Sequence, residues 1–410
     1  MDLVVERCGG LDVHKDTVVA CVRVPGAGRR REQTIVTFGT TTIQLLALRD
    51  WLVANGVTLV GMESTGVYWK PVYFVLEEAV ECWLLNAQHL RNVPGRKTDV
   101  ADAAWICQLI EHGLVRPSFV PPRPIRELRN LCRYRRSQIE ERTREAQRLD
   151  KVLQDAGIKL SSVATRILGL SGRAMLNALV AGTRDPEVLA ELAKGTLRKK
   201  IPQLRDALEG RFGAHHGLLV GQILAKLDFL DEVIANLSVE IDRMIAAYEP
   251  QVALLVTIPG IDRRTAQELI AEIGVDMSRF PTAAHLASWA GMAPGNNITG
   301  GERGSGKTTN GDVWLRDILV QCAWSAARTR DTYLAAQFWR LARRIGKKKA
   351  AIAVGHSILV ICWHLLTEDA DYDDLGGDYV QRRANPDRQR DRAIEQLHTL
   401  GYQVTLKKPA

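Results

Sequence analysis

The proline-rich segment 117–125 separates two parts of the chain that follow different hydrophobic periods. It holds four prolines in nine residues, and proline fixes φ and removes a backbone donor, so we expect a linker there. Before it, short apolar runs alternate with segments of helical spacing. From Arg126 to about Tyr248 the pattern is almost wholly helical. The 410 residues are therefore expected to combine an α/β part with an all-α part.

Residues 1–116 are predicted to form one α/β domain. Strand character occurs in CGGLDVHKDTVVACVRV, EQTIVTFGTT, VTLVGMES and VECWLLNAQ. Helical spacing occurs in TTIQLLALRDWLVANG, VYWKPVYFVLEEA and DVADAAWICQLIEHGLV. A β-rich start followed by a βαβα alternation is typical of a mixed sheet with helices packed on it.

Residues 117–250 are predicted to be a linker followed by a helical region. Its clearest feature is a run of apolar residues at spacings of four and three: Ile223, Leu227, Leu230, Ile234, Leu237, Ile241 and Met244. This seam over three heptads favours a coiled coil, and the alternative is a long helix packed on its own domain.

Residues 251–368 are predicted to form a third, mainly helical unit, followed by a loosely ordered charged tail at 369–410. The stretch VALLVTIPGIDRRTAQELIAEIG reads as a helix, a Pro-Gly turn and a second helix. That pattern resembles a helix-hairpin-helix, whose turn presents backbone N–H groups to phosphate.

Four carboxylates in the first domain are candidates for a metal site. Asp12 lies within the first predicted strand, Glu63 ends a later one, and Asp99 and Asp102 share one face of a helix. An aspartate inside a strand is unfavourable unless it is paired or binds a cation. Clustered carboxylates without thiolates prefer hard ions such as Mg²⁺ or Mn²⁺, which can promote phosphoryl transfer.

Simpler interpretations exist for these residues. Asp99 could be a helix N-terminal charge behind a Thr98 cap, and Glu63 could be a loop carboxylate. His14 could join Asp12 as a ligand, although histidine is more often structural. His215 and His216 are adjacent, so we do not expect them to share a helix face.

The glycine-rich segment 294–316 contains GERGSGKT (301–308), which fits the P-loop pattern. A P-loop needs a strand before it and a helix directly after it, but turn residues stand on both sides here. We therefore favour a loop that approaches a nucleic-acid phosphate, with charge from Arg303, Lys307 and Arg316. Its hydroxyls include Thr299 and Ser305, and an activated hydroxyl is a candidate nucleophile. The alternative is a solvated basic loop.

Basic residues outnumber acidic ones by 55 to 47, for a net charge of +8, and this surplus suits a polyanion partner. Two clusters stand out. Ten Lys and Arg residues lie between positions 121 and 151, among them Arg133, Arg135 and Arg136. The second cluster, which follows Phe338 and Trp339, is Arg343, Arg344, Lys347, Lys348 and Lys349. Although such runs are often solvated helix faces, two of them beside a carboxylate site favour nucleic acid as the substrate.

The sequence gives little support for a membrane-spanning segment or for a disulfide-linked fold. The most apolar stretch, residues 350–366, holds two histidines and a glycine, and the start of the chain has no signal-peptide pattern. The seven cysteines are scattered without a C-x-x-C pair, so neither a disulfide framework nor a thiolate zinc site is expected. We therefore expect the protein to work in a reducing cytosol.

Five ordered motifs carry a family resemblance: GGLDVHKD, GMESTGVYWKP, KTDVADAAWI, IPGI and PGNNITGGERGSGKTTNGDVWLR. In their order and spacing the chain resembles the IS one-ten family of insertion-sequence transposases, the bridge-RNA-guided DEDD recombinases. The resemblance covers most of residues 8–368.

The resemblance implies a RuvC-like (RNase H-type) first domain whose Asp12, Glu63, Asp99 and Asp102 hold Mg²⁺ or Mn²⁺. It also implies a dimerising coiled coil and a C-terminal transposase domain with a hydroxyl nucleophile that links covalently to DNA. In the family, domains from different subunits build one site, and a bridge RNA pairs with target and donor DNA. A homo-dimer or tetramer in the bacterial cytosol is therefore expected.

One departure concerns the nucleophile. The family has serine at the position that matches Thr299, and threonine adds a methyl group and stiffens χ1. We favour Thr299 over Ser305 for this role. Two other functions stay open: a RuvC-like nuclease that uses water without a covalent intermediate, and a non-catalytic nucleic-acid binder.

Overall fold

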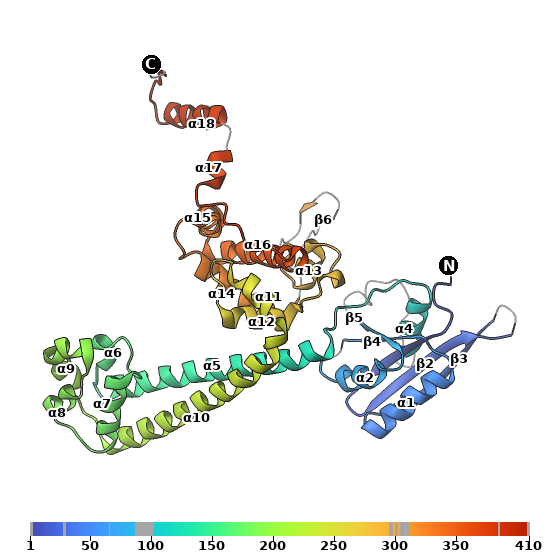
Figure 1. The fold of residues 1–410 in the computed structure, drawn as a ribbon, viewed down its shortest axis with the longest axis horizontal. Coiled ribbons are helices and arrows are strands. Elements are labelled where there is room, and N and C mark those ends of the chain that lie inside the picture. Colours follow the sequence, from blue (N-terminus) through green and yellow to red (C-terminus); the bar gives the residue numbers. More distant parts are fainter. Residues whose placement is uncertain are drawn as a thin grey trace. The chain divides into compact units, whose positions relative to one another are not determined.

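The computed structural model describes residues 3–27, 30–64, 66–86, 102–294, 298–299, 302–303, 308, 311–383 and 386–407. The chain divides into two compact units, Met1–Val120 and Pro121–Ala410 (Figure 1). The boundary lies inside the proline-rich segment, four residues after the predicted end of the first domain. The helical region and the C-terminal region, which we predicted as separate domains, belong to one unit.

The first unit is built on a five-stranded mixed sheet of order β3-β2-β1-β4-β5. The strands are β1 (Cys8–Val13), β2 (Thr17–Pro25), β3 (Arg31–Gly39), β4 (Leu59–Glu63) and β5 (Glu81–Leu85). The first three strands pair antiparallel, whereas β4 runs parallel to both β1 and β5. The predicted mixed sheet is confirmed.

Helices cover both faces of this sheet and bury a separate apolar cluster on each. They are α1 (Thr42–Ala54), α2 (Trp69–Leu76) and α4 (Asp102–Glu111). Leu11 and Met62 point from the sheet into the cluster formed with α1 and α2. Cys8 and Leu59 point the other way, into the cluster formed with Cys107 and Ile110 of α4. Strand alternation explains the two faces, because neighbouring residues point to opposite sides.

Two long helices, α5 (Arg123–Asp155) and α10 (Ala214–Ile245), lie side by side in the second unit (Figure 1). The helix α5 begins at Arg123, before the predicted end of the linker, with Pro124 in its first turn where no N–H partner is needed. The short helices at the tip of this hairpin are α6 (Leu160–Val163), α7 (Leu170–Val180), α8 (Pro186–Glu191), a 3₁₀ turn (Gly195–Lys200) and α9 (Ile201–Leu208).

The heptad seam of α10 is used inside the chain. Leu227, Leu230 and Ile241 are buried in a helix whose most extensive helix contact is with α5, and Leu227 shares an apolar cluster with Leu149 of α5. The Leu227 part of the seam therefore packs on α5 of the same chain, whereas Ile234 and Leu237 are only half-buried. A coiled coil between chains stays a prediction.

The rest of the second unit is also helical. Its elements are α11 (Glu249–Val256), α12 (Arg263–Ile273), α13 (Ala283–Trp289), β6 (Ile298–Thr299), β7 (Glu302–Arg303), α14 (Val313–Ala326), α15 (Tyr333–Ile345), α16 (Lys347–Glu368), α17 (Tyr379–Arg383) and α18 (Pro386–Thr399), with 3₁₀ turns at Ala246–Tyr248 and Met277–Arg279. The predicted tail includes the helices α17 and α18 among its described residues.

The helix α16 is long and apolar enough to cross a membrane by length and composition alone. It packs against α13, α14 and α15, and Val354, Ile358 and Cys362 are fully buried there. These contacts are those of the core helix of the C-terminal region.

The helices α11 and α12 form the predicted pair around the IPGI turn. Gly260 has φ +94° in this turn, and a Cβ placed on it would lie 2.6 Å from the backbone nitrogen of Ala326 in α14. Glycine is therefore required both by the backbone conformation and by the close approach of α14. Phosphate binding by this turn stays a prediction.

Candidate active site

Asp12 and Glu63 come from neighbouring parallel strands at the same end of the sheet. The register pairs Leu11 of β1 with Met62 of β4, so Asp12 and Glu63 are the next residues on the two strands. Leu11 and Met62 both point toward α1 and α2. Strand alternation therefore directs Asp12 and Glu63 to the opposite face, which α4 covers.

The helix α4 lies directly on this face because two glycines leave room for it. A Cβ placed on Gly10 would lie 2.1 Å from the carbonyl oxygen of Ala103, and one placed on Gly61 would lie 2.4 Å from Cδ1 of Ile110. The Cys8 and Cys107 sulfurs are 3.5 Å apart. Cys8 of β1 faces Cys107 of α4. Gly10, two residues later on the strand, lies against Ala103 and Cys107, one turn earlier on the helix.

The helix therefore runs antiparallel to β1, and its first residue, Asp102, lies at the end of the strand that carries Asp12. One carboxylate oxygen of Asp102 is buried. Asp12 Oδ2 lies 3.1 Å from Nε2 of His14, and the side chains of Asp12 and His14 are 21% and 62% exposed. Three of the four predicted acids are thus brought to one end of one face, while Asp99 lies outside the described residues.

The donor set of this end of the sheet fits a hard divalent cation. Three carboxylates and the His14 imidazole would offer oxygen and nitrogen ligands, and among the described residues the thiols of Cys8 and Cys107 lie farther along β1 and α4. Hydrogen bonds with Cys21 and Cys8, and then burial, raise the pKa of the Cys107 thiol. The end of the sheet that carries Asp12, Glu63 and Asp102 stays the candidate site.

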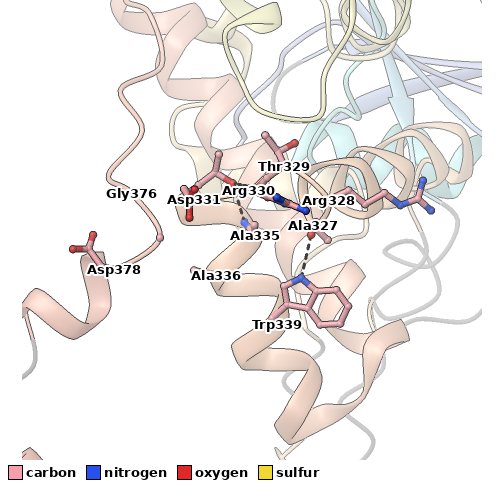
Figure 2. Close-up of a pocket in the computed structure, with 12 residues that line it drawn as sticks. Ala327, Arg328, Thr329, Arg330, Asp331, Ala335, Ala336, Trp339, Gly376 and Asp378 are labelled. Carbon is pink, nitrogen blue, oxygen red and sulfur yellow. Dashed lines mark hydrogen bonds between the residues drawn. The ribbon is translucent and has the colours of Figure 1, made fainter.

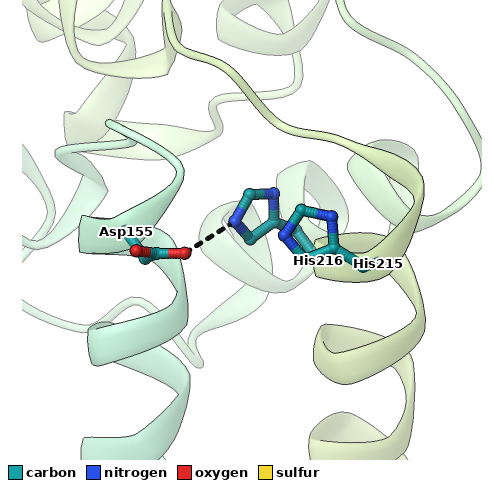
Figure 3. A group of neighbouring side chains, drawn as sticks. All are labelled: Asp155, His215 and His216. Atoms are coloured by element: carbon teal, nitrogen blue, oxygen red, sulfur yellow. Dashed lines mark hydrogen bonds and ion pairs between the residues drawn. The ribbon is translucent and has the colours of Figure 1, made fainter.

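A second group of possible ligands lies at the tip of the helical hairpin. Asp155, His215 and His216 have ligand atoms that all lie within 4.8 Å of one another (Figure 3). By the same criterion, Asp12, Glu63 and Asp102 do not form such a group among the described residues. His215 is exposed and His216 is buried, although their ring centroids are only 3.8 Å apart.

The hydrogen bonds of His216 explain this arrangement without a metal. Its Nδ1 accepts from the backbone N–H of Gly213 at 3.0 Å, so Nε2 carries the proton and donates to Asp155 Oδ2, also at 3.0 Å. Both ring nitrogens are therefore occupied, and the buried ring caps α10 and joins it to the end of α5. This is the structural role that histidine more often has.

The described parts of the glycine-rich segment differ from the elements that flank a P-loop. Residues 298–299 and 302–303 form a small antiparallel pair, and α14 begins only at Val313, after Asp312, whose carboxylate accepts from the N–H of Leu315. A P-loop helix would begin directly after Lys307 and Thr308.

Only some of the predicted residues of this loop lie among the described residues. Thr299 lies in β6 with Glu302 as its strand partner, and Arg303 lies in β7. Ser305 and Lys307 lie outside the described residues, as do the side chains of Thr299 and Arg303. Arg316 is half-buried in the first turns of α14. The nucleophile and the phosphate contacts of the loop stay predictions.

The prediction that Arg135 and Arg136 bind nucleic acid is wrong, because both side chains are buried inside the second unit. Arg135 is 2% exposed and its Nη1 donates to Gln267 Oε1 at 3.1 Å. Arg136 lies 3.3 Å from Glu268 Oε2. These arginines face carboxylate and amide groups of α12 rather than solvent.

Arg133 belongs to the same internal network. Its Nε and Nη2 donate to the two carboxylate oxygens of Glu272, each at 2.7 Å, and Nη2 also donates to Asp312 Oδ2 at 2.9 Å. Arg129 Nε lies 3.1 Å from Glu272 as well. Burial raises the pKa of Glu272, and the hydrogen bond from Arg133 opposes that rise. The network ties α5 to α12 and to the cap of α14, Asp312, near the end of the glycine-rich segment.

The second basic cluster is exposed. Arg343, Arg344 and Lys347–Lys349 lie at the junction of α15 and α16. Among the described residues, no carboxylate lies within 4.0 Å of their charged nitrogens. Of the two aromatic residues before them, Phe338 is fully buried and Trp339 is 45% exposed. This surface is available to a polyanion, and nucleic-acid binding by it stays a prediction.

Comparison with known proteins decides the family. A family model described as a transposase matches residues 9–158, and another, described as a transposase of the IS116/IS110/IS902 family, matches residues 252–340. The chain belongs to the IS110 (IS one-ten) family of transposases. The transposase is 25% identical over 338 residues to a probable family 20 transposase of Pseudomonas aeruginosa, an alignment that covers 79% of this chain and 88% of the relative.

Two further relatives of the transposase differ in coverage. It is 27% identical over 322 residues to the insertion element IS900 uncharacterized 42 kDa protein of Mycobacterium paratuberculosis, with 70% of this chain and 78% of the relative covered. It is 34% identical over 126 residues to the pilin gene-inverting protein of Moraxella bovis, with 30% and 38% covered. Membership of the family implies a DNA substrate and a recombinase or transposase activity.

Several residues that build these regions were not foreseen from the sequence. Gly10 and Gly61 admit α4, and the Gly-Gly pair at 9–10 was the available signal. Glu268, Glu272 and Asp312 pair with four arginines of α5: Arg129, Arg133, Arg135 and Arg136. The spacing of Glu268 and Glu272 by four residues places them on one helix face, but nothing in it indicates which helix they meet.

Proposed function

We propose that this transposase is a metal-dependent DNA recombinase whose first domain is RuvC-like. The observation that carries the proposal is the placement of Asp12, Glu63 and Asp102 at one end of one sheet face. The sheet order, with three antiparallel strands followed by two parallel ones, supports an RNase H-type fold. Asp99 would complete the set of four acids.

Asp12, Glu63, Asp99 and Asp102 would hold Mg²⁺ or Mn²⁺, which when bound supplies Lewis-acid stabilisation of a phosphodiester. The Thr299 hydroxyl would attack the phosphorus and form a new P–O bond. The P–O bond to the leaving strand would break, its oxygen would take up a proton, and the hydroxyl proton would pass to a carboxylate or to solvent. The phosphothreonyl link would conserve the bond energy, so rejoining would need no ATP.

Further parts of the proposal come from the family. The acids of one subunit and the hydroxyl loop of another would build one site in a dimer or tetramer, and a bridge RNA would pair with target and donor DNA. A DNA-acting enzyme of this kind would work in the bacterial cytosol. The exposed cluster at the junction of α15 and α16 would contact the nucleic acid.

The decisive experiment is recovery of a protein–DNA adduct that survives denaturation, with radiolabelled DNA and Mg²⁺. The adduct should disappear in Thr299→Ala, persist in Thr299→Ser and persist in Ser305→Ala. Asp12→Asn should remove both adduct and cleavage, with Asp16→Asn, an exposed residue of the β1–β2 turn, as the matched control. An adduct that persists in Thr299→Ala and is lost in Ser305→Ala would move the nucleophile to Ser305.

A second candidate function is a RuvC-like nuclease that uses water. The threonine at position 299 favours it, because its methyl group crowds the attacking oxygen. This enzyme would cleave DNA with Mg²⁺, form no adduct and be unaffected by Thr299→Ala. A non-catalytic binder would instead keep its full function in Asp12→Asn and in metal-free buffer.

A further inference from the structure

A cavity of about 630 Å³ lies in the C-terminal region, and its lining residues belong neither to the carboxylate set nor to the glycine-rich segment (Figure 2). Its walls are the loop 327–332 between α14 and α15, the first turns of α15 with Trp339, and the tail segment 376–378. This volume is within the range of pockets that hold small organic ligands.

The tail segment is attached to the loop by backbone hydrogen bonds. The N–H of Gly377 donates to the carbonyl oxygen of Asp331 at 3.0 Å. Asp374 Oδ1 accepts from the N–H groups of Tyr333 at 2.9 Å and Gly376 at 2.7 Å. Asp331 has φ +59°, an uncommon conformation for a residue other than glycine. The cavity is therefore a built feature, with a wall contributed by a distant part of the chain.

Trp339 gives the cavity an aromatic surface with a fixed orientation. Its indole N–H donates to the carbonyl oxygen of Ala327 at 3.1 Å, and the ring of Phe338 packs edge-on at a centroid distance of 5.3 Å. The side chain is nevertheless 45% exposed. Lys347 Nζ lies 5.7 Å from the ring centroid. An exposed aromatic ring held by its neighbours is a platform on which a base can stack.

The charge around the cavity favours a phosphate chain. Arg328 and Arg330 line it, and within the part of the chain that the structure describes neither has a carboxylate within 4.0 Å. Of the two acids in the lining, Asp378 is paired with Arg382 at 3.0 Å, which leaves Asp331. In Figure 2 Arg328 extends to the side opposite the tail segment. The arginines of α5 differ in this respect, because internal carboxylates already neutralise them.

We propose that this cavity binds an unpaired nucleotide of single-stranded nucleic acid, with its base stacked on Trp339 and its flanking phosphates on Arg328, Arg330 and Lys347. Stacking on aromatic rings beside a basic groove is how proteins bind single strands without reading sequence. The inference rests on the proposed recombinase function, since strand exchange exposes unpaired nucleotides. DNA and RNA strands share this chemistry, and the experiment separates them.

The test is fluorescence anisotropy with labelled oligonucleotides of about 15 residues, one of deoxythymidine and one of uridine. Binding is measured in EDTA with the full-length Asp12→Asn protein, so the result does not depend on catalysis. Trp339→Ala should weaken binding of the favoured strand about tenfold, whereas Trp339→Phe, which keeps a stacking ring, should lose less. An oligonucleotide with abasic sites should bind Asp12→Asn more weakly and should not be weakened further by Trp339→Ala.

Charge is tested by Arg328→Glu and Arg330→Glu, with Arg166→Glu as the matched control, because Arg166 is exposed and lies between α6 and α7. The two cavity variants should weaken binding and flatten its salt dependence, and the control should do neither. Circular dichroism shows that each variant is folded. If Trp339→Ala and Trp339→Phe bind each oligonucleotide with the same affinity as the parent Asp12→Asn protein, the proposal is overturned, even if the adduct experiment succeeds.

Discussion

At the scale of single residues, Gly10 determines whether α4 can lie over the end of β1 that carries Asp12. The two atoms nearest to a Cβ at this position are backbone atoms of α4, the Ala103 carbonyl oxygen at 2.1 Å and the Cys107 nitrogen at 2.5 Å. Backbone atoms of a helix cannot rotate away as a flexible side chain can. A methyl group at position 10 must therefore push the helix off the sheet.

We expect Gly10→Ala to lower the free energy of unfolding of the first unit by about 2–3 kcal/mol, as overpacking in a core does. Gly39→Ala is the matched control in the same sheet, because the nearest atom to a Cβ there is the flexible Gln44 Cγ at 3.3 Å. The control should stay within about 1 kcal/mol of wild type. Urea unfolding measures both, and equal midpoints for the two variants would contradict the close approach of α4.

At the scale of elements, the ion network of α5 is a structural joint rather than a nucleic-acid contact. Glu272 is 2% exposed and receives two hydrogen bonds from Arg133. Removing one partner of a buried ion pair leaves the other charges without compensation, so Glu272→Gln should destabilise the second unit by about 3–5 kcal/mol.

The matched control for that variant is Glu127→Gln. It breaks the exposed pair of Arg123 and Glu127, which both lie on α5. Exposed pairs contribute little, so the change should be under about 1 kcal/mol. The measurement is the denaturant midpoint of the transition in which the second unit unfolds. If Glu272→Gln unfolds at the wild-type midpoint, the network does not hold α12 and α14 on α5.

How far the sequence predicts these elements depends on which contacts are local. Period-2 and period-3.6 patterns predicted the strands and helices of the first unit and the long helix α10, because burial on one face imposes those periods. The same patterns could not identify the partner of the α10 seam, since α5 and a second chain would bury the same leucines. Nor could they show that Arg135 points inward, because its partners Gln267 and Glu268 lie more than 130 positions away.

In the candidate site too, the sequence predicts the features that depend on local patterns and not those that depend on distant residues. The placement of Asp12 and Glu63 at one end of the sheet follows from two strands that carry an acid among their last two residues, which the sequence displays. The approach of Asp102 depends on Gly10 and Gly61, whose role appears only when the helix is on the sheet. The cavity beside Trp339 depends on a tail segment that meets the loop 327–332 from about 45 residues farther along the chain, and no local pattern encodes that contact.

At the scale of the whole molecule, the first unit has the properties of an independently folding domain. Its two apolar clusters, which contain Leu11, Met62 and Cys107 among others, are formed by residues before position 121. A length of about 120 residues is typical of a domain with one core. The last segment also matters, because the N–H of Ser118 donates to the carbonyl oxygen of Leu84 at 2.7 Å and Val120 packs against the first cluster.

We therefore expect a fragment of residues 1–120 to unfold cooperatively in urea, with a slope of about 1–3 kcal/mol per molar. A fragment that ends at residue 113 lacks the Ser118 contact and leaves the edge of β5 uncovered, so it should unfold at lower urea and aggregate more readily. Circular dichroism and sedimentation measure the two properties. A longer fragment that unfolds without cooperativity would show that this unit needs the rest of the chain, and the carboxylate end of its sheet would then be stable only in the intact protein.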